Sequence, residues 1–243
     1  MNYLIGSLLL ILLSASTFQD NFLQDQRRYP RVREAMEARQ QTLQEQLQQH
    51  ELEIGNFHLL MIAYKDDDLL ELYAKEKQAT VYQKITEYEI CSRSGTLGPK
   101  RQQGDYQVPE GFYHIDRFNP ASNFHLSVGL NYPNLADQRK SKYKRLGGDI
   151  FIHGACVTIG CLPMTDDKIK EIYLYAIHAR NNGQQKIPVY IFPFRMTDEN
   201  LTAYTESAEL DAFWSNLKVG YDQFMNNHEE LRFSVASNGD YQF

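Results

Sequence analysis

The sequence is short of positive charge and holds few cysteines. It has 25 Lys and Arg against 31 Asp and Glu, a formal net charge of −6, and no strongly basic segment. Nucleic-acid binding requires a basic patch or stripe, so nucleic acid is not an expected partner. No internal repeat is present. The 243 residues, 42% hydrophobic and 23% charged, fit one globular domain, alone or with an appended segment.

The N-terminus has no Lys or Arg ahead of its apolar run, which covers residues 4–13. This run is shorter than the ~20 apolar residues that cross a bilayer. Ser14, Ala15 and Ser16 supply the small residues of a signal-peptidase site. We predict a cleaved signal peptide over residues 1–16 and export to the periplasm or cell envelope of a bacterium. An uncleaved signal is the alternative, and it would be the only membrane attachment, because no second hydrophobic span follows.

Only three cysteines are present, Cys91, Cys156 and Cys161. In an oxidising compartment an odd count leaves at least one thiol unpaired. A Cys91–Cys156 disulfide is one possibility. For Cys156 we favour packing as a small apolar residue over a disulfide or a metal site.

The chain divides into a polar N-terminal part, residues 17–55, and a domain, residues 56–243. Pro30 can open a helix, and Val32, Met36 and Leu43 recur at helical spacing. The pattern predicts one long helix ending near Gly55. We interpret it as a spacer, with partner binding as the alternative.

From Phe57 the pattern becomes one of short strands, with late helices. Thr165 is a helix N-cap type, and Gly183 is placed to end that helix. These patterns predict a mainly β fold of the α+β class. Predicted strands cover residues 57–65, 69–76, 80–90, 112–115, 124–130, 149–154, 187–196 and 231–237, and predicted helices follow Thr165 and cover residues 208–230.

The chemistry is concentrated in residues 152–166, IHGACVTIGCLPMTD. A thiol attacks as thiolate, and a neighbouring base or a helix N-terminus lowers its pKa. His153 ends a predicted strand, and Cys161 lies just ahead of the helix after Thr165. Gly160 would let the backbone approach a reacting carbonyl. We predict Cys161 as the nucleophile and His153 as its base.

This segment resembles the L,D-transpeptidase catalytic family (the YkuD-type domain). That family has His-Gly followed by Ser or Thr, any residue, Gly and Cys, here His153, Gly154, Thr158, Gly160 and Cys161. The short His-to-Cys spacing is closest to the YafK-like branch. The resemblance covers about residues 57–197 and includes the segments GPK (98–100), GD (104–105), VPEGFY (108–113), NYPN (131–134), MTD (164–166) and IFPFRM (191–196).

The resemblance implies a β-sandwich or open barrel that acts on peptidoglycan stem peptides without a cofactor or metal. The cysteine would form a thioester and pass the acyl group to an amine or to water. The backbone amides of Gly160 and Cys161 would bind the oxyanion, and a carbonyl near Gly154 would orient the imidazole of His153.

Two positions depart from the family pattern. Pro163 stands where many members have a carboxylate-binding Arg, and Ile159 where many have a His. Arg195 could replace the missing Arg. Arg195, Thr158 and Tyr132 are therefore the predicted substrate-binding residues.

Three alternatives to transfer stay open. A hydrolase would use the same thioester to cleave cross-links or release wall-linked protein, as the YafK-like branch implies. A wall-binding module would keep the fold without catalysis. A zinc domain would use His153, Cys156 and Cys161, with His178 as a further ligand, although their spacing matches no common zinc pattern.

Overall fold

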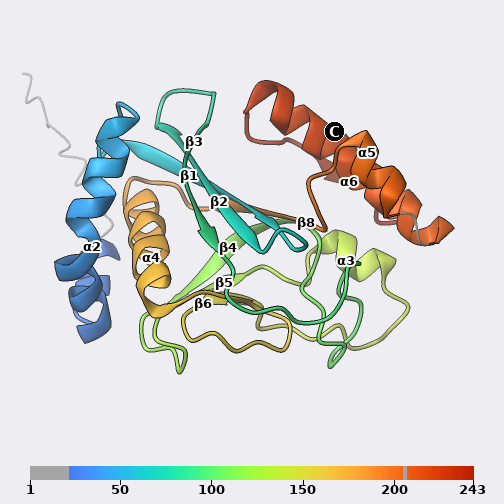
Figure 1. Ribbon diagram of the computed structural model, residues 1–243, viewed down its shortest axis with the longest axis horizontal. Helices are drawn as coiled ribbons and strands as arrows, with labels where there is room; N and C mark the ends of the chain where they lie inside the picture. Colours follow the sequence, from blue (N-terminus) through green and yellow to red (C-terminus); the bar gives the residue numbers. More distant parts are fainter. Residues whose placement is uncertain (1–21, 205–206) are drawn as a thin grey trace, which may run out of the picture.

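The computed structural model describes residues 22–204 and 207–243, so the predicted signal, residues 1–16, lies outside the described part. Its centre is a mixed eight-stranded sheet with helices on both faces (Figure 1), in the order β3-β2-β1-β8-β4-β5-β6-β7. The strands are β1 Phe57–Tyr64, β2 Leu69–Glu76, β3 Gln83–Glu89, β4 Gly111–Asn119, β5 Ser127–Leu130, β6 Phe151–His153, β7 Leu162–Pro163 and β8 Ile187–Phe192, with β9 Ser234–Val235 and β10 Tyr241–Gln242 in a separate pair. The helices are α1 Phe22–Arg27, α2 Pro30–Gln49, α3 Leu135–Lys140, α4 Asp166–Asn181, α5 Asp198–Ala203 and α6 Ala208–Asn227. The predicted α+β fold is confirmed.

The central strands are buried on both faces. Successive side chains of a strand point to opposite sides, so Leu59 and Met61 of β1 join one apolar cluster and Leu60 and Ile62 join the other. The first cluster lies on the α4 side and the second on the α6 side (Figure 1). Two covered faces explain why the central strands are continuous apolar runs rather than alternating ones.

Helix α4 lies between the sheet and α2 (Figure 1). Val32, Ala35, Leu43 and Leu47 of α2 are fully buried in the same cluster as the α4 face. The predicted spacer covers residues 17–55. Its helix α2 thus forms an outer layer on the domain. The boundary at residue 55 stays a prediction.

The long helix predicted to open at Pro30 is present as α2, but it ends at Gln49 rather than near Gly55, and the short helix α1 ahead of it was not predicted. Pro30 is at the first position of α2, and Tyr29 before it is extended, with φ −84° and ψ 130°. Proline disfavours helical geometry in the residue that precedes it, which interrupts the helix at this point.

Most of the other predicted elements are present with small shifts of their ends. Thr165 caps α4 by accepting the N–H of Lys168, as predicted. The C-cap of that helix is Asn182, and Gly183 follows it with φ +102°. Besides α1, four short elements were missed: α3, α5, β7 and β10. Within residues 22–204 and 207–243, no helix combines the length and apolar character needed to cross a bilayer.

Candidate active site

His153 is the last residue of β6, which pairs with β5 on one side and with β7 on the other. The imidazole is almost fully buried, with 3% of the residue exposed. Its Nδ1 lies 2.6 Å from the carbonyl oxygen of Gly154. A carbonyl can only accept, so Nδ1 carries the hydrogen, and Nε2 of the neutral ring is free to accept a proton. The predicted orientation by a carbonyl near Gly154 is thus present.

Burial sets the charge state of this ring. Desolvation lowers the pKa of His153 below its ordinary value, and the hydrogen bond to Gly154 opposes that effect in part. Near neutral pH the ring is therefore mainly uncharged, the state that a general base requires.

Cys161 follows a tight turn held by Thr158. The Thr158 hydroxyl accepts the backbone N–H groups of Gly160 at 3.2 Å and of Cys161 at 2.8 Å. It also donates to the carbonyl of Cys161 at 2.9 Å. Gly160 has φ +133°, and a Cβ there would lie 3.0 Å from the carbonyl oxygen of Gln107, so the turn requires glycine at this position.

These hydrogen bonds affect two predicted roles, that of the backbone amides as oxyanion donors and that of Thr158 in binding substrate. The amides of Gly160 and Cys161, predicted as oxyanion donors, both have Thr158 as their partner in the structure. They would need to exchange or share that partner during a reaction. Thr158, predicted to bind substrate, makes its recorded hydrogen bonds within the turn and also lines the cavity beside it.

The thiol of Cys161 is not a resting thiolate. Burial raises its pKa above the ordinary value, and the carboxylate of Asp149 adds to the increase. A backbone hydrogen bond with Phe151 and the charge of Lys100 oppose this increase in part. The thiol also donates to the carbonyl of Asp149 at 3.6 Å. The expectation of a lowered thiol pKa is not met in the resting protein, because burial raises it; α4 begins at Asp166, beyond β7. The thiol must lose its proton to a base during the reaction.

Cys161 lies where two cavities meet. The larger, of about 480 Å³, is lined by both His153 and Cys161, together with Phe124, Asp149 and Thr158. The two predicted catalytic side chains therefore open onto the same space. The ring of Phe124 lies 4.7 Å from that of His153, centroid to centroid.

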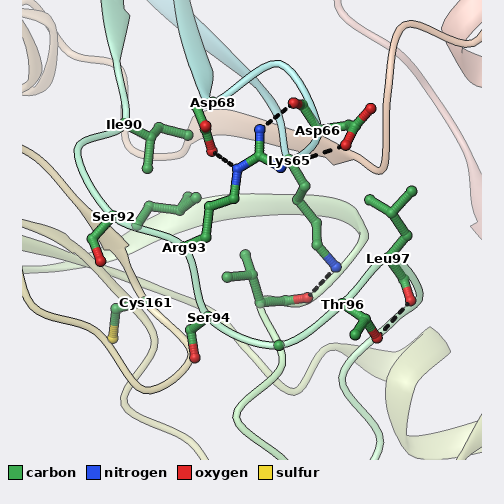
Figure 2. A pocket seen from close by; sticks show the side chains of 13 residues that line it. Lys65, Asp66, Asp68, Ile90, Ser92, Arg93, Ser94, Thr96, Leu97 and Cys161 are labelled. Atoms are coloured by element: carbon green, nitrogen blue, oxygen red, sulfur yellow. Dashed lines mark hydrogen bonds and ion pairs between the residues drawn. The ribbon is translucent and has the colours of Figure 1, made fainter.

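The smaller cavity, of about 230 Å³, is also lined by Cys161. Figure 2 shows Arg93 in it, pointing toward Asp66 and Asp68, with Cys161 on the wall. The guanidinium contacts Asp68 at 2.5 Å and Asp66 at 3.6 Å. Lys65 donates to the carboxylate of Glu110 at 2.8 Å. The acidic side chains of this cavity are therefore ion-paired.

Cys91 and Cys156 form a disulfide, with Cα atoms 5.5 Å apart. The favoured interpretation of Cys156 as an inert packing residue was wrong, because its loop is exposed and its sulfur is bonded. The bond ties this loop to the segment that follows β3 and lines the smaller cavity. It also leaves Cys161 as the free thiol and removes Cys156 from the zinc alternative, since a disulfide sulfur is no thiolate ligand.

The remaining predicted substrate residues lie outside both cavities. Arg195 contacts Glu71 at 2.9 Å and Asp67 at 3.3 Å, and its guanidinium lies over the ring of Tyr64. Tyr132 is buried, and its hydroxyl lies 3.3 Å from the carbonyl of Leu146. Neither lines a cavity that Cys161 lines.

Asp149 and Phe124 are cavity residues that sequence reasoning missed. Asp149 has φ +55°, a geometry the sequence does not reveal, and its carbonyl receives the thiol. Phe124 belongs to a segment that was predicted as strand but precedes β5 as a loop. No local sequence signal distinguishes either residue.

A free cysteine and a neutral, carbonyl-oriented histidine line one cavity, and a thiol beside a base is the arrangement that cysteine nucleophiles require. The chain belongs to the L,D-transpeptidase catalytic domain family (YkuD), whose sequence model matches residues 59–191. It is 41% identical over 180 residues to YafK of Escherichia coli (strain K12), which is named as a candidate L,D-transpeptidase. That match covers 73% of this chain and 70% of the relative, and YafK of Escherichia coli O157:H7 matches equally.

Solved structures with a similar fold are more distant. The helical cell shape determining protein Pgp2 of Campylobacter jejuni aligns with TM-score 0.45 and 20% identity, over 74% of this chain and 73% of that one. Its K307A mutant aligns with TM-score 0.46 and 22% identity, over 68% of this chain and 56% of that chain. Bd1075 of Bdellovibrio bacteriovorus aligns with TM-score 0.40 and 24% identity, over 70% of this chain and 57% of that chain.

Proposed function

We propose that the chain is a cysteine-dependent acyl transferase of the L,D-transpeptidase type that acts on peptidoglycan stem peptides. The observation that carries the proposal is the opening of His153 and Cys161 onto one cavity in a chain of this family. Within the cavity, burial keeps the imidazole neutral and the thiol protonated. This is the resting state of a pair in which the base removes the proton only as the nucleophile attacks.

The chemistry follows from these protonation states. Nε2 of His153 takes the thiol proton while Sγ of Cys161 forms a bond to a stem-peptide carbonyl carbon. The tetrahedral intermediate then breaks its C–N bond, and the imidazolium gives the proton to the departing amine. A thioester on Cys161 remains. An amine or a water molecule attacks it, His153 again takes the proton, and the thiol is restored with that proton.

The two cavities supply separate approaches to the sulfur. The larger one contains His153 and apolar wall residues, which suits the stem peptide that donates the acyl group. The smaller one is lined by Cys161 but not by His153, and it suits the acceptor. Separate approaches allow the leaving amine and the incoming acceptor to occupy different places.

Hydrolysis by the same thioester is the second candidate, and one observation favours it. The carboxylates nearest to the smaller cavity, Asp66 and Asp68, are already paired with Arg93. An ammonium acceptor would find no unpaired carboxylate there among the described lining residues, whereas water needs none. The substrate of this route would be a stem peptide joined to a wall-linked protein, and hydrolysis would release the protein.

The proposal is tested with defined muropeptides and mass analysis of the products. Tetrapeptide muropeptides with an amine acceptor yield a cross-linked product if the chain transfers, and protein-linked muropeptides yield free protein if it hydrolyses. Cys161→Ala and His153→Ala should each abolish both products while the fold is retained. Turnover that survives Cys161→Ala would refute the thioester.

A thiol probe separates an enzyme from a non-catalytic wall-binding module. Cys161 is the free thiol of the protein, so labelling of the native chain reports on this residue. Labelling that rises with pH and slows in His153→Ala supports catalysis. Slow, pH-insensitive labelling would instead indicate a binding module.

The proposed place of action is the periplasm, reached through a signal peptide at residues 1–16. Peptidoglycan lies outside the cytoplasmic membrane, so an enzyme with this substrate must be exported. Cell fractionation and the mass of the mature protein test the proposal. A full-length, cytoplasmic product would contradict it.

A further inference from the structure

One peptide group links His153 to an acidic side chain outside the cavity. The carbonyl of Gly154 accepts the Nδ1–H of His153 at 2.6 Å. The N–H on the other side of the same peptide bond, that of Ala155, donates to Oδ1 of Asp166 at 2.9 Å. A peptide bond is conjugated, so a hydrogen bond at its N–H strengthens its carbonyl as an acceptor.

The local backbone is built to present this peptide group. Ala155 has φ +58°, a left-handed conformation that residues other than glycine rarely adopt. A Cβ added at Gly154 would lie 2.7 Å from Oδ1 of Asp166 and 2.9 Å from the carbonyl oxygen of Phe124. The carboxylate is thus packed directly against the backbone of the turn, and that packing requires the glycine.

Asp166 is anchored independently of the turn. It is the first residue of α4, directly after the N-cap Thr165, whose side chain accepts the N–H of Lys168. The N–H of Met164 also donates to the carbonyl of His153 at 2.7 Å, which joins the same two segments. The carboxylate therefore holds a fixed place relative to β6.

We infer that Asp166 is a positioning residue for the proposed reaction, acting on His153 through the Gly154–Ala155 peptide. It stabilises the turn and increases the electron density on the carbonyl that binds Nδ1–H. Both effects keep Nε2 directed to the cavity and make it a stronger base. This inference rests on the proposed function only for its catalytic consequence; the link between the carboxylate and the imidazole is a property of the resting protein.

The surroundings of the imidazole leave few competing charges. Cys161 and Asp149 are the titratable groups that share its cavity, and the aromatic ring of Phe124 covers the imidazole. No charged side chain contributes to the resolved pKa shift of His153, whose causes are burial and the Gly154 hydrogen bond. A change made at Asp166 can therefore be followed at the imidazole.

The test compares two neighbouring carboxylates of one helix. Asp166→Asn keeps an acceptor for the Ala155 N–H but removes the charge. Asp167→Asn is the matched control, because Asp167 shares the first turn of α4 and pairs instead with Arg39 at 3.1 Å and Lys170 at 3.7 Å. Each is made in a Cys161→Ala background, so that the thiol does not titrate with the imidazole.

NMR titration of His153 in these proteins gives the first readout. We expect Asp166→Asn to lower the pKa of His153 by on the order of half a pH unit and Asp167→Asn to leave it unchanged. An equal pKa shift in both variants would show a general effect of helix charge. No shift in either variant would show that Asp166 does not act on His153 through the peptide group. Both results overturn the inference.

Turnover on the tetrapeptide muropeptide, with Cys161 restored, gives the second readout. We expect Asp166→Asn to lower kcat on the order of tenfold, to leave KM unchanged and to move the acidic limb of the pH profile to lower pH. Asp166→Glu should recover part of kcat. A wild-type chain with no turnover, in which the NMR shift is nevertheless found, would refute the proposed function and leave the link intact.

Discussion

The side chain of Thr158 and the backbone of Cys161 are joined in both directions. The hydroxyl accepts the N–H of Cys161 at 2.8 Å and donates to its carbonyl at 2.9 Å. The same oxygen also accepts the N–H of Gly160. One hydroxyl therefore determines the conformation of the turn on which the nucleophile depends.

Replacing that hydroxyl should affect rate more than binding. In Thr158→Val two amides lose their partner and the turn can relax, so we expect kcat to fall on the order of tenfold to a hundredfold. Thr158→Ser keeps the oxygen and should retain most of the activity. Steady-state kinetics on a muropeptide measure both variants. Equal rates for the Val and Ser variants would show that the hydroxyl does not set the conformation of the turn.

The disulfide between Cys91 and Cys156 should contribute strongly to stability. It joins residues 65 apart in the sequence, and a loop of that length corresponds to about 4 kcal/mol in the chain-entropy model. We expect the double variant Cys91→Ala, Cys156→Ala to lower the free energy of unfolding by up to that amount. Urea denaturation measures it, with Cys161→Ala as the control that removes a thiol but no cross-link. Equal stability of the two variants would contradict the prediction.

Much of the fold was accessible from the sequence because local signals and tertiary packing agree. The hairpin of β1 and β2 follows from two apolar runs around a polar turn, and Thr165 begins α4 with the hydrogen bond that its residue type predicts. The start of α2 at Pro30 also follows from its residue type, whereas α1 was missed because its six residues are too few to show a helical period.

The site was predictable only as far as its residue types. His153, Cys161 and the glycines form a recognisable spacing, but the partners of the side chains depend on contacts distant in sequence. Arg195 was predicted to bind substrate, but its guanidinium pairs with Glu71. The raised thiol pKa of Cys161 arises from burial, which no spacing reveals. Cys156 could be paired only once Cys91 was known to lie beside it.

Removing the carboxylate of Asp149 should make the Cys161 thiol more reactive. Burial is the main cause of the raised thiol pKa and Asp149 adds to it, so Asp149→Asn should lower that pKa and increase the thiolate fraction near neutral pH. The carboxylate is exposed to solvent, so we expect about a twofold to fivefold faster reaction with iodoacetamide. Rates should converge at high pH, where both proteins are fully thiolate.

The control for this prediction is Asp116→Asn. Asp116 and Asp149 both pair with Arg117, at 3.1 Å and 2.9 Å, but Asp116 lines neither cavity around the sulfur. It should leave the alkylation rate close to that of the wild type. If both variants accelerate alkylation equally, the release of Arg117 rather than the loss of the carboxylate is the cause.

His178 of α4 should make the fold sensitive to acid. Burial lowers its pKa to about 4, with Arg27 adding to the effect, and its Nε2 is buried without a hydrogen-bond partner among the described residues. Between that pKa and the ordinary value the unfolded chain binds a proton that the folded chain does not. Stability from this group is thus full above about pH 6.5 and is lost as the pH falls toward 4, by about 3 kcal/mol.

His178→Phe removes this titration while keeping an aromatic ring of similar size in the core. We expect its free energy of unfolding to decline less than that of the wild type between pH 7 and pH 4.5, because the other acid-labile groups are common to both proteins. Urea denaturation at four pH values gives the difference curve, and the pH 8 point corrects for any change in packing. Parallel curves across the whole range would mean that the buried ring accepts its proton as readily as an exposed one, which its surroundings in α4 argue against.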